Sequence, residues 1–201
     1  MQTNYQLDRN KRVWVEQPVE DTPELATYLE QIQGLIPGFA LYPPQKRQVT
    51  ILHIGKPLHL YLELTAAGAR LSFEAFAQLL QPVLREAVQA ITDPVKVKTH
   101  DLAIFGPYDS PVLVARLTHD PNWLRHRDPA LVALDDFLYY AGIAFPSKFV
   151  RRSRNLRFST RDSFKPHITL GSVPPGTIIA GIEVPSIDIT LGPTRICGVG
   201  Q

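Results

Sequence analysis

The chain has 201 residues and a net charge of +2, with 44% hydrophobic and 20% charged residues. This composition is ordinary for a globular protein and excludes a disordered, collagen-like or coiled-coil chain. No run approaches the roughly 18 apolar residues of a membrane span, and the N-terminus lacks the apolar core of a signal peptide. A single cysteine, Cys197, excludes an internal disulfide and a cysteine-built zinc site. We therefore expect one cytoplasmic domain over residues 1–201, monomeric, without cofactor and without membrane contact.

The predicted elements are short and mixed in order. Strands are expected at residues 13–17, 39–42, 48–54, 95–105, 111–118, 167–173 and 187–191, with a last one near 196. Helices are expected from Pro23 to Gly34, over residues 72–91 and from Asp128 to Gly142. Thr22 is the predicted cap of the first helix, and Pro82 must kink the second helix or begin another. Strands and helices without strict β-α-β alternation favour an α+β fold with largely antiparallel sheets.

Positive charge is concentrated in one segment, residues 151–165. It holds six basic residues against a single acid, Asp162; they are Arg151, Arg152, Arg154, Arg157, Arg161 and Lys165. The segment is either a solvated loop or an anion-binding loop. In the second case the arginine forks bind phosphate, and Phe158 and Phe164 offer stacking faces.

Two of the six histidines lie in predicted strands with matching local sequence, VTILHIGKP around His53 and FKPHITLGS around His167. Side chains two apart on a strand share a face, so the imidazole of His167 and the hydroxyl of Thr169 point the same way. Such a pair fits a phosphate, because the hydroxyl donates to a non-bridging oxygen while the imidazole moves a proton. Two such strands would supply one acid and one base. The alternative is two unrelated, half-buried structural histidines.

These motifs resemble the signature of the two-histidine (2H) phosphoesterase superfamily, which includes LigT-like 2′-5′ RNA ligases and 2′,3′-cyclic nucleotide phosphodiesterases. The family pattern is His-x-Thr/Ser, present twice. The resemblance covers most of the chain. It implies two pseudo-symmetric lobes, each a mainly antiparallel sheet with flanking helices, around a central cleft that carries both motifs.

The resemblance also implies roles for individual residues. His53 and His167 would form the catalytic pair that hydrolyses a 2′,3′-cyclic phosphate, at an RNA 3′ end or in a nucleotide, and Thr169 would hold a non-bridging oxygen. Which histidine is the base stays open. The candidates for binding phosphate or base are Gly55, Lys56, Arg151, Arg152, Arg154, Lys165, Tyr42 and Phe164. For the aromatic candidates, packing in the core is the alternative to stacking on a base.

The first motif departs from the family pattern, because Gly55 stands where the family has threonine or serine. Loss of one such donor costs a factor of roughly 10²–10³ in rate elsewhere. Lys56 or an arginine of residues 151–161 could reach the phosphate instead, or Gly55 could admit the substrate backbone or a water. Three alternatives to hydrolysis therefore stay open: 2′-5′ RNA ligation, a non-catalytic module that binds nucleotides or RNA ends, and a structural protein.

A polar cluster suggests a metal site on first inspection. Its members are His119, Asp120, His126 and Asp128. The cluster lacks the spacing of known metal motifs, and a polar loop explains it. We therefore expect no metal.

Overall fold

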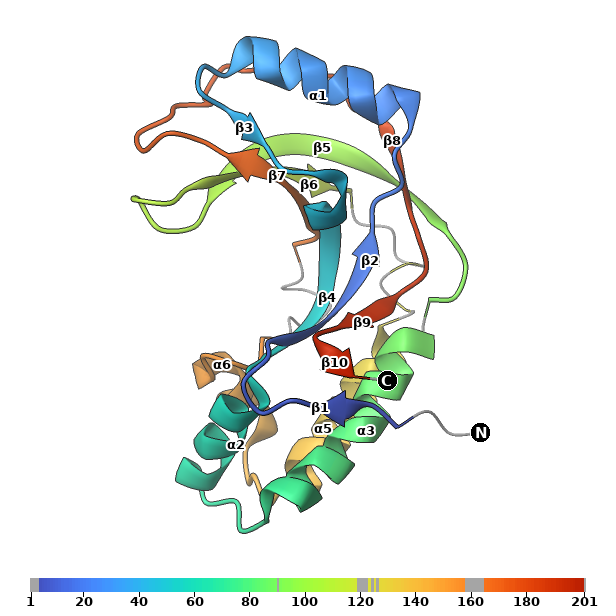
Figure 1. Cartoon of the computed structure of the whole chain (residues 1–201), viewed down its shortest axis with the longest axis vertical. Helices are drawn as coiled ribbons and strands as arrows, with labels where there is room; N and C mark the ends of the chain where they lie inside the picture. Colours follow the sequence, from blue (N-terminus) through green and yellow to red (C-terminus); the bar gives the residue numbers. More distant parts are fainter. Residues whose placement is uncertain are drawn as a thin grey trace.

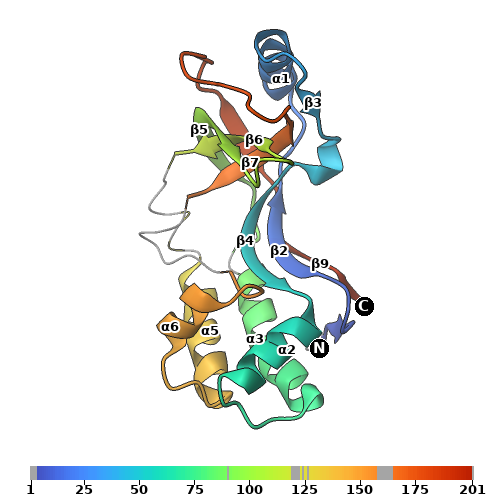
Figure 2. The same ribbon diagram turned by 90° about the vertical axis from the view of Figure 1, so that its left-hand side faces the viewer.

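A computed structural model of the chain describes residues 4–89, 91–118, 123, 125, 127–157 and 165–200. The chain forms two lobes, one above the other in the views of Figures 1 and 2. Each lobe has its own β-sheet, and every described strand pairing is antiparallel. The predicted α+β fold with antiparallel sheets is therefore confirmed.

The first lobe, here the five-stranded lobe, contains a sheet covered by one helix. The strands in spatial order are β3 (Ala40–Leu41), β7 (His167–Ser172), β6 (Val112–Leu117), β5 (Val95–Phe105) and β8 (Asp188–Leu191). Helix α1 (Pro23–Leu35) lies over this sheet (Figure 1). The Thr22 hydroxyl accepts a hydrogen bond from the Leu25 amide and caps the helix as predicted. Gly34 lies inside the last turn rather than after it.

The second lobe, here the three-stranded lobe, combines a smaller sheet with a layer of helices. Its strands in order are β4 (Gln48–Gly55), β2 (Val13–Pro18) and β9 (Arg195–Cys197), and β1 (Gln6–Leu7) pairs with β10 (Val199–Gly200) nearby. Its helices are α2 (Pro57–Ala66), α3 (Phe73–Gln89), α5 (Asp128–Tyr140) and α6 (Pro146–Arg152). A short 3-10 helix, Pro44–Lys46, precedes β4.

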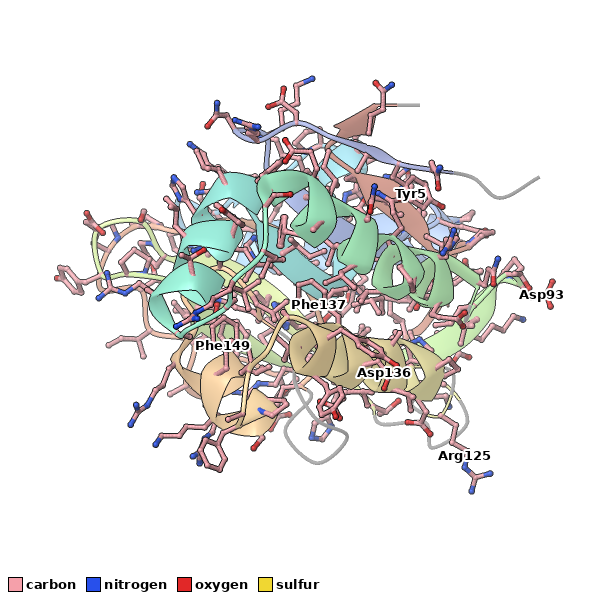
Figure 3. All side chains as sticks on the ribbon, turned by 90° about the horizontal axis from the view of Figure 1, so that it is seen from below. Tyr5, Asp93, Arg125, Asp136, Phe137 and Phe149 are labelled. Carbon is pink, nitrogen blue, oxygen red and sulfur yellow. The ribbon has the colours of Figure 1, made fainter. Side chains whose placement is uncertain are left out.

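Helices α3 and α5 pack through their apolar faces. The rings of Phe76 and Phe137 meet edge to face with centroids 6.0 Å apart, and Figure 3 shows Phe137 between the two helices. Pro82 lies inside one continuous helix and does not begin a second. Val132 is 61% exposed on α5, because the buried stripe of this helix runs through Ala130, Leu134 and Phe137.

Among the described α-helices, α2 and α6 are absent from the sequence prediction. Both are short and begin with proline, without a side-chain cap, so neither shows a long apolar period. Arg151 and Arg152 therefore end a helix, where a loop was expected.

The strands that carry the two histidine motifs meet at the junction of the lobes. Cα atoms of β4 and β7 come within 8 Å of one another. Buried apolar side chains of both lobes join in one cluster. Among the helices that the structure describes, none is long and apolar enough to cross a membrane.

Candidate active site

His53 lies half-buried on β4, where Arg157 of the basic segment pairs with it. Its backbone N–H donates to the Arg157 carbonyl over 3.1 Å, and its own carbonyl accepts from the Arg157 N–H over 2.8 Å. Its ring Nδ1 lies 3.0 Å from the carbonyl oxygen of Asn155. Because a carbonyl oxygen only accepts, Nδ1 carries the proton, and in the neutral ring Nε2 has the free lone pair.

His167 begins β7 and is held in the same way. Its Nδ1 lies 2.9 Å from the Lys165 carbonyl oxygen, so Nε2 is again the nitrogen left for chemistry. The ring packs edge to face on Phe105, with centroids 4.8 Å apart. Thr169 is half-buried on the same face of the strand, whereas Ile168 is fully buried on the other. The imidazole and the hydroxyl therefore share one side of β7, as the alternation predicts.

A pocket of about 370 Å³ opens at His53. Its lining is almost entirely basic or polar: Arg12, His53, Gly55, Lys56, His59, Arg154, Asn155 and Arg157. Four of these side chains are cations, and no carboxylate lines the pocket within the described residues. None of the four cations forms an ion pair with another residue that the structure describes. Uncompensated positive charge around an imidazole is typical of a site for a phosphate-bearing ligand.

Gly55 has a positive φ of +71°, a conformation that side-chain-bearing residues rarely adopt. A β-bulge adjoins it, because Gly55 pairs with Val13 and His53 with Trp14, which leaves Ile54 as the extra residue. A Cβ atom at position 55 would lie 2.9 Å from Oδ1 of Asn155 and 3.2 Å from its Cα. The missing hydroxyl of the first motif is therefore a consequence of local structure, since Asn155 fills the space that a threonine would need.

The loop that carries Asn155 is anchored to α2 by a carboxylate. Glu63 accepts hydrogen bonds from the Ser153 hydroxyl and, over 2.9 Å, from the Arg154 amide. The Ser153 hydroxyl oxygen in turn accepts from the amides of Asn155 and Leu156. These contacts fix the backbone that orients the His53 ring.

Of the other predicted site residues, the structure brings Gly55, Lys56 and Arg154 together with His53 in one pocket. His167 and Thr169 are not among the described residues that line this pocket. A single cleft shared by both motifs therefore stays a prediction, supported by the approach of β4 and β7.

The remaining predicted residues lie elsewhere. Arg151 and Arg152 are exposed at the end of α6, and neither lines the His53 pocket. Tyr42 follows β3 with the Lys46 ammonium 5.4 Å from its ring centre. Lys165 is exposed and contributes its carbonyl to His167. Phe164 lies outside the described residues, as do Phe158 and Arg161, and so do His119, Asp120 and His126 of the polar cluster. Within the described part, no group of three or more His, Cys, Asp or Glu side chains could hold a metal.

Arg12, His59 and Asn155 were not predicted as site residues, and Arg157 was predicted only as part of the basic segment. Arg12 precedes β2, and only the pairing of β2 with β4 brings it to His53. His59 follows Lys56 by three residues, which is one turn at the start of the unpredicted helix α2. For Asn155 the sequence carries no signal, because its role depends on an antiparallel contact about a hundred residues away in the chain.

The structure predicts how His53 titrates. Burial lowers the pKa of His53 below its ordinary value of 6.5; the hydrogen bond to Asn155 opposes this, and the charges of Arg157 and Arg12 add to it. The ring is therefore neutral at pH 7. Because the unfolded chain takes up this proton near pH 6.5 and the folded chain at a lower pH, the free energy of unfolding falls as pH drops through 6.5.

An NMR titration of the His53 ring should place its midpoint below 6.5, and Arg157→Gln should move that midpoint upward. The substitution leaves the backbone pairing of residue 157 in place, so it tests the charge alone. A midpoint at or above 6.5 in the wild type would show that the ring is solvated and the 153–157 loop open.

Comparison with known proteins gives similarities of structure only. No family model matches the chain. No curated protein matches it either. Among solved structures, TT0787 of Thermus thermophilus has 18% identity, a TM-score of 0.47 and coverage of 92% of this chain and 86% of its own. LigT of E. coli in its apo form has 13% identity, a TM-score of 0.47 and 96% coverage of both chains.

A third similar structure is that of a phosphoesterase, with 12% identity, a TM-score of 0.45 and coverage of 95% of this chain and 99% of its own.

Proposed function

We propose that the chain is a two-histidine phosphodiesterase that hydrolyses 2′,3′-cyclic phosphates, at RNA 3′ ends or in nucleotides, without needing a metal ion. The observation that carries the proposal is the pocket at His53. There an imidazole with a fixed tautomer faces a space lined by Arg12, Lys56, Arg154 and Arg157, with no carboxylate among the described residues beside them. The pocket combines binding of an anion with transfer of a proton.

In this proposal His53 is the base. Its lowered pKa keeps Nε2 unprotonated at pH 7. Nε2 takes a proton from water as the water oxygen attacks phosphorus, and a new P–O bond forms. The bond from phosphorus to one ribose oxygen breaks, and His167, protonated at Nε2, donates its proton to that oxygen. The products are a phosphate monoester and a ribose hydroxyl, and the two imidazoles exchange protonation states.

Charge on the non-bridging oxygens is balanced by side chains of the same pocket. Lys56, Arg154 and Arg157 supply cationic donors. The side-chain amide of Asn155 occupies the space that a threonine at position 55 would fill, and we assign it the place of the missing hydroxyl. In the second motif, the Thr169 hydroxyl donates to a non-bridging oxygen. Two imidazoles and these donors provide the acid, the base and the charge stabilisation that the reaction requires.

The crowding at Gly55 favours one second candidate, a module that binds nucleotides or RNA ends without turnover. It shares the cationic pocket with the enzyme but assigns no proton transfer to the histidines. If a ribose hydroxyl of a second RNA attacked the same cyclic phosphate in place of water, the reaction would be ligation.

The experiment that tests the proposal is hydrolysis of the four 2′,3′-cyclic nucleotides in EDTA, with wild type beside His167→Ala and His100→Ala. We expect turnover in EDTA that falls about 10²- to 10⁴-fold in His167→Ala, the range for loss of one acid–base group. His100, exposed on β5 outside the pocket, is the matched control and should leave the rate unchanged. Binding of all four nucleotides without turnover would favour the non-catalytic module. Equal rates for His167→Ala and wild type would overturn the paired-histidine mechanism.

A further inference from the structure

A second pocket, of about 420 Å³, lies beside the first in the three-stranded lobe. It is formed between α2 and the stretch around α6, and Figure 3 shows Phe149 between these two helices. Its apolar part includes Ala66, Ile143, Phe145 and Phe149. Phe145 is 69% exposed, so an aromatic face is open to a ligand. Exposed aromatic rings at a pocket mouth are suited to stacking with a nucleobase.

The rim of this second pocket is cationic. Lys148 and Arg152 line it, and the Lys148 ammonium lies 5.9 Å from the ring centre of Phe145. Its described lining contains one carboxylate, Glu63, whose two oxygens already accept hydrogen bonds from Ser153 and from the Arg154 amide. A ligand that combines a flat ring with a negatively charged group therefore matches the second pocket better than a neutral apolar ligand does.

The two pockets share a wall. Arg154 lines both, and the Glu63-anchored loop at Ser153–Asn155 stands between them. A ligand with its phosphate at His53 could therefore extend over Arg154 into the second pocket. A cyclic mononucleotide has a single phosphate, which the cations at His53 already match. Lys148 and Arg152 are placed to bind a second phosphate group.

We infer that the second pocket binds the nucleotide next to the reacting phosphate, with its base against Phe145 and Phe149 and its phosphate against Lys148 and Arg152. The inference rests on the proposed function for the place of the reacting phosphate. It narrows the substrate class to a single-stranded RNA end, in preference to a free cyclic mononucleotide.

Two substrates test the inference: a trinucleotide that ends in a 2′,3′-cyclic phosphate and the corresponding cyclic mononucleotide. We expect wild type to have the higher kcat/KM for the trinucleotide. Phe145→Ala should lower that value about 5- to 150-fold, the range for loss of one base–aromatic stack, and leave the mononucleotide unaffected. Tyr108→Ala is the matched control, because Tyr108 is an aromatic residue of the five-stranded lobe that is at least as accessible, 79% exposed, and lies outside both pockets.

A binding experiment separates this inference from the proposed reaction. It measures anisotropy of a labelled trinucleotide ending in a 3′-phosphate, competed by the 3′-phosphorylated mononucleotide. Tighter binding of the trinucleotide that is lost in Phe145→Ala and reduced in Lys148→Gln supports the second pocket, even if no cyclic phosphate is hydrolysed. Equal affinity for the two ligands in wild type, or equal effects of both substitutions on both ligands, overturns it, even if cyclic mononucleotides are hydrolysed.

Discussion

Replacing His53 by alanine should lower the kcat for hydrolysis of a 2′,3′-cyclic phosphate about 10²- to 10⁴-fold, which is the contribution of a positioned acid–base group. The structure gives the physical reason. The ring is half-buried, its Nδ1 is held on the Asn155 carbonyl, and its Nε2 is presented to a pocket with four cations. Because those cations remain in the variant, we expect KM to change much less than kcat.

A second substitution, His53→Gln, makes this result easier to interpret. Glutamine retains an amide N–H that can serve the Asn155 carbonyl but has no basic nitrogen. It should therefore be as inactive as His53→Ala and more stable to urea. His100→Ala again controls for removal of an imidazole from a strand. A kcat within a factor of about three of wild type in either His53 variant would show that another group activates the water, and the assignment of His53 as base would be wrong.

Introducing the hydroxyl that the first motif lacks, by Gly55→Thr, should destabilise the protein instead of improving it. The backbone at position 55 has φ of +71°, and strain of this kind costs about 1–3 kcal/mol for a residue with a side chain. The added Cβ also meets Asn155 at 2.9 Å, and overpacking of a filled site costs about 1–3 kcal/mol more. We expect a lower free energy of urea unfolding and a lower kcat, since the Asn155 loop must move.

Two comparisons divide this effect into its parts. Gly68 has φ of +105°, and a Cβ atom added there would have no neighbouring atom within 4 Å, so Gly68→Thr reports the backbone cost alone. The double variant Gly55→Thr/Asn155→Ala removes the 2.9 Å approach to Oδ1 of residue 155, and should recover part of the lost stability but not the activity. If Gly55→Thr is as stable as wild type and faster, the 153–155 loop does not occupy the position that the structure assigns to it.

Eight of the ten described strands and the first helix could be predicted because each is decided by its own sequence, whereas the two-residue strands β1 and β10 were not predicted. Residues 48–54 are rich in β-branched side chains, and Thr22 caps α1 within one turn. Helix α2 could not be predicted, because ten residues that begin at Pro57 carry little periodic signal. Its stability comes from burial of Leu60 and Leu64 against the rest of the lobe.

The candidate site divides in a similar way. Lys56 and Arg154 were predicted, since one adjoins a motif and the other lies in a dense run of charge, and the structure places both at His53. Arg12 and Asn155 reach the pocket only through the pairing of segments far apart in sequence. The sequence could not explain why glycine stands at position 55, because the explanation depends on a φ angle and on which side chain fills the neighbouring space.

The pairing of Arg157 with His53 also has a consequence for solubility. β4 is an edge strand of its sheet, and an uncovered edge offers backbone groups on which a second chain could add a strand. Residue 157 covers that edge at His53, and two hydrogen bonds saturate the groups there. The loop that orients the imidazole through Asn155 thus also protects the sheet from self-association through residue 157. Conditions that loosen the 153–157 loop would impair the candidate active site and, at the same time, expose an unpaired strand edge to which another chain could bind.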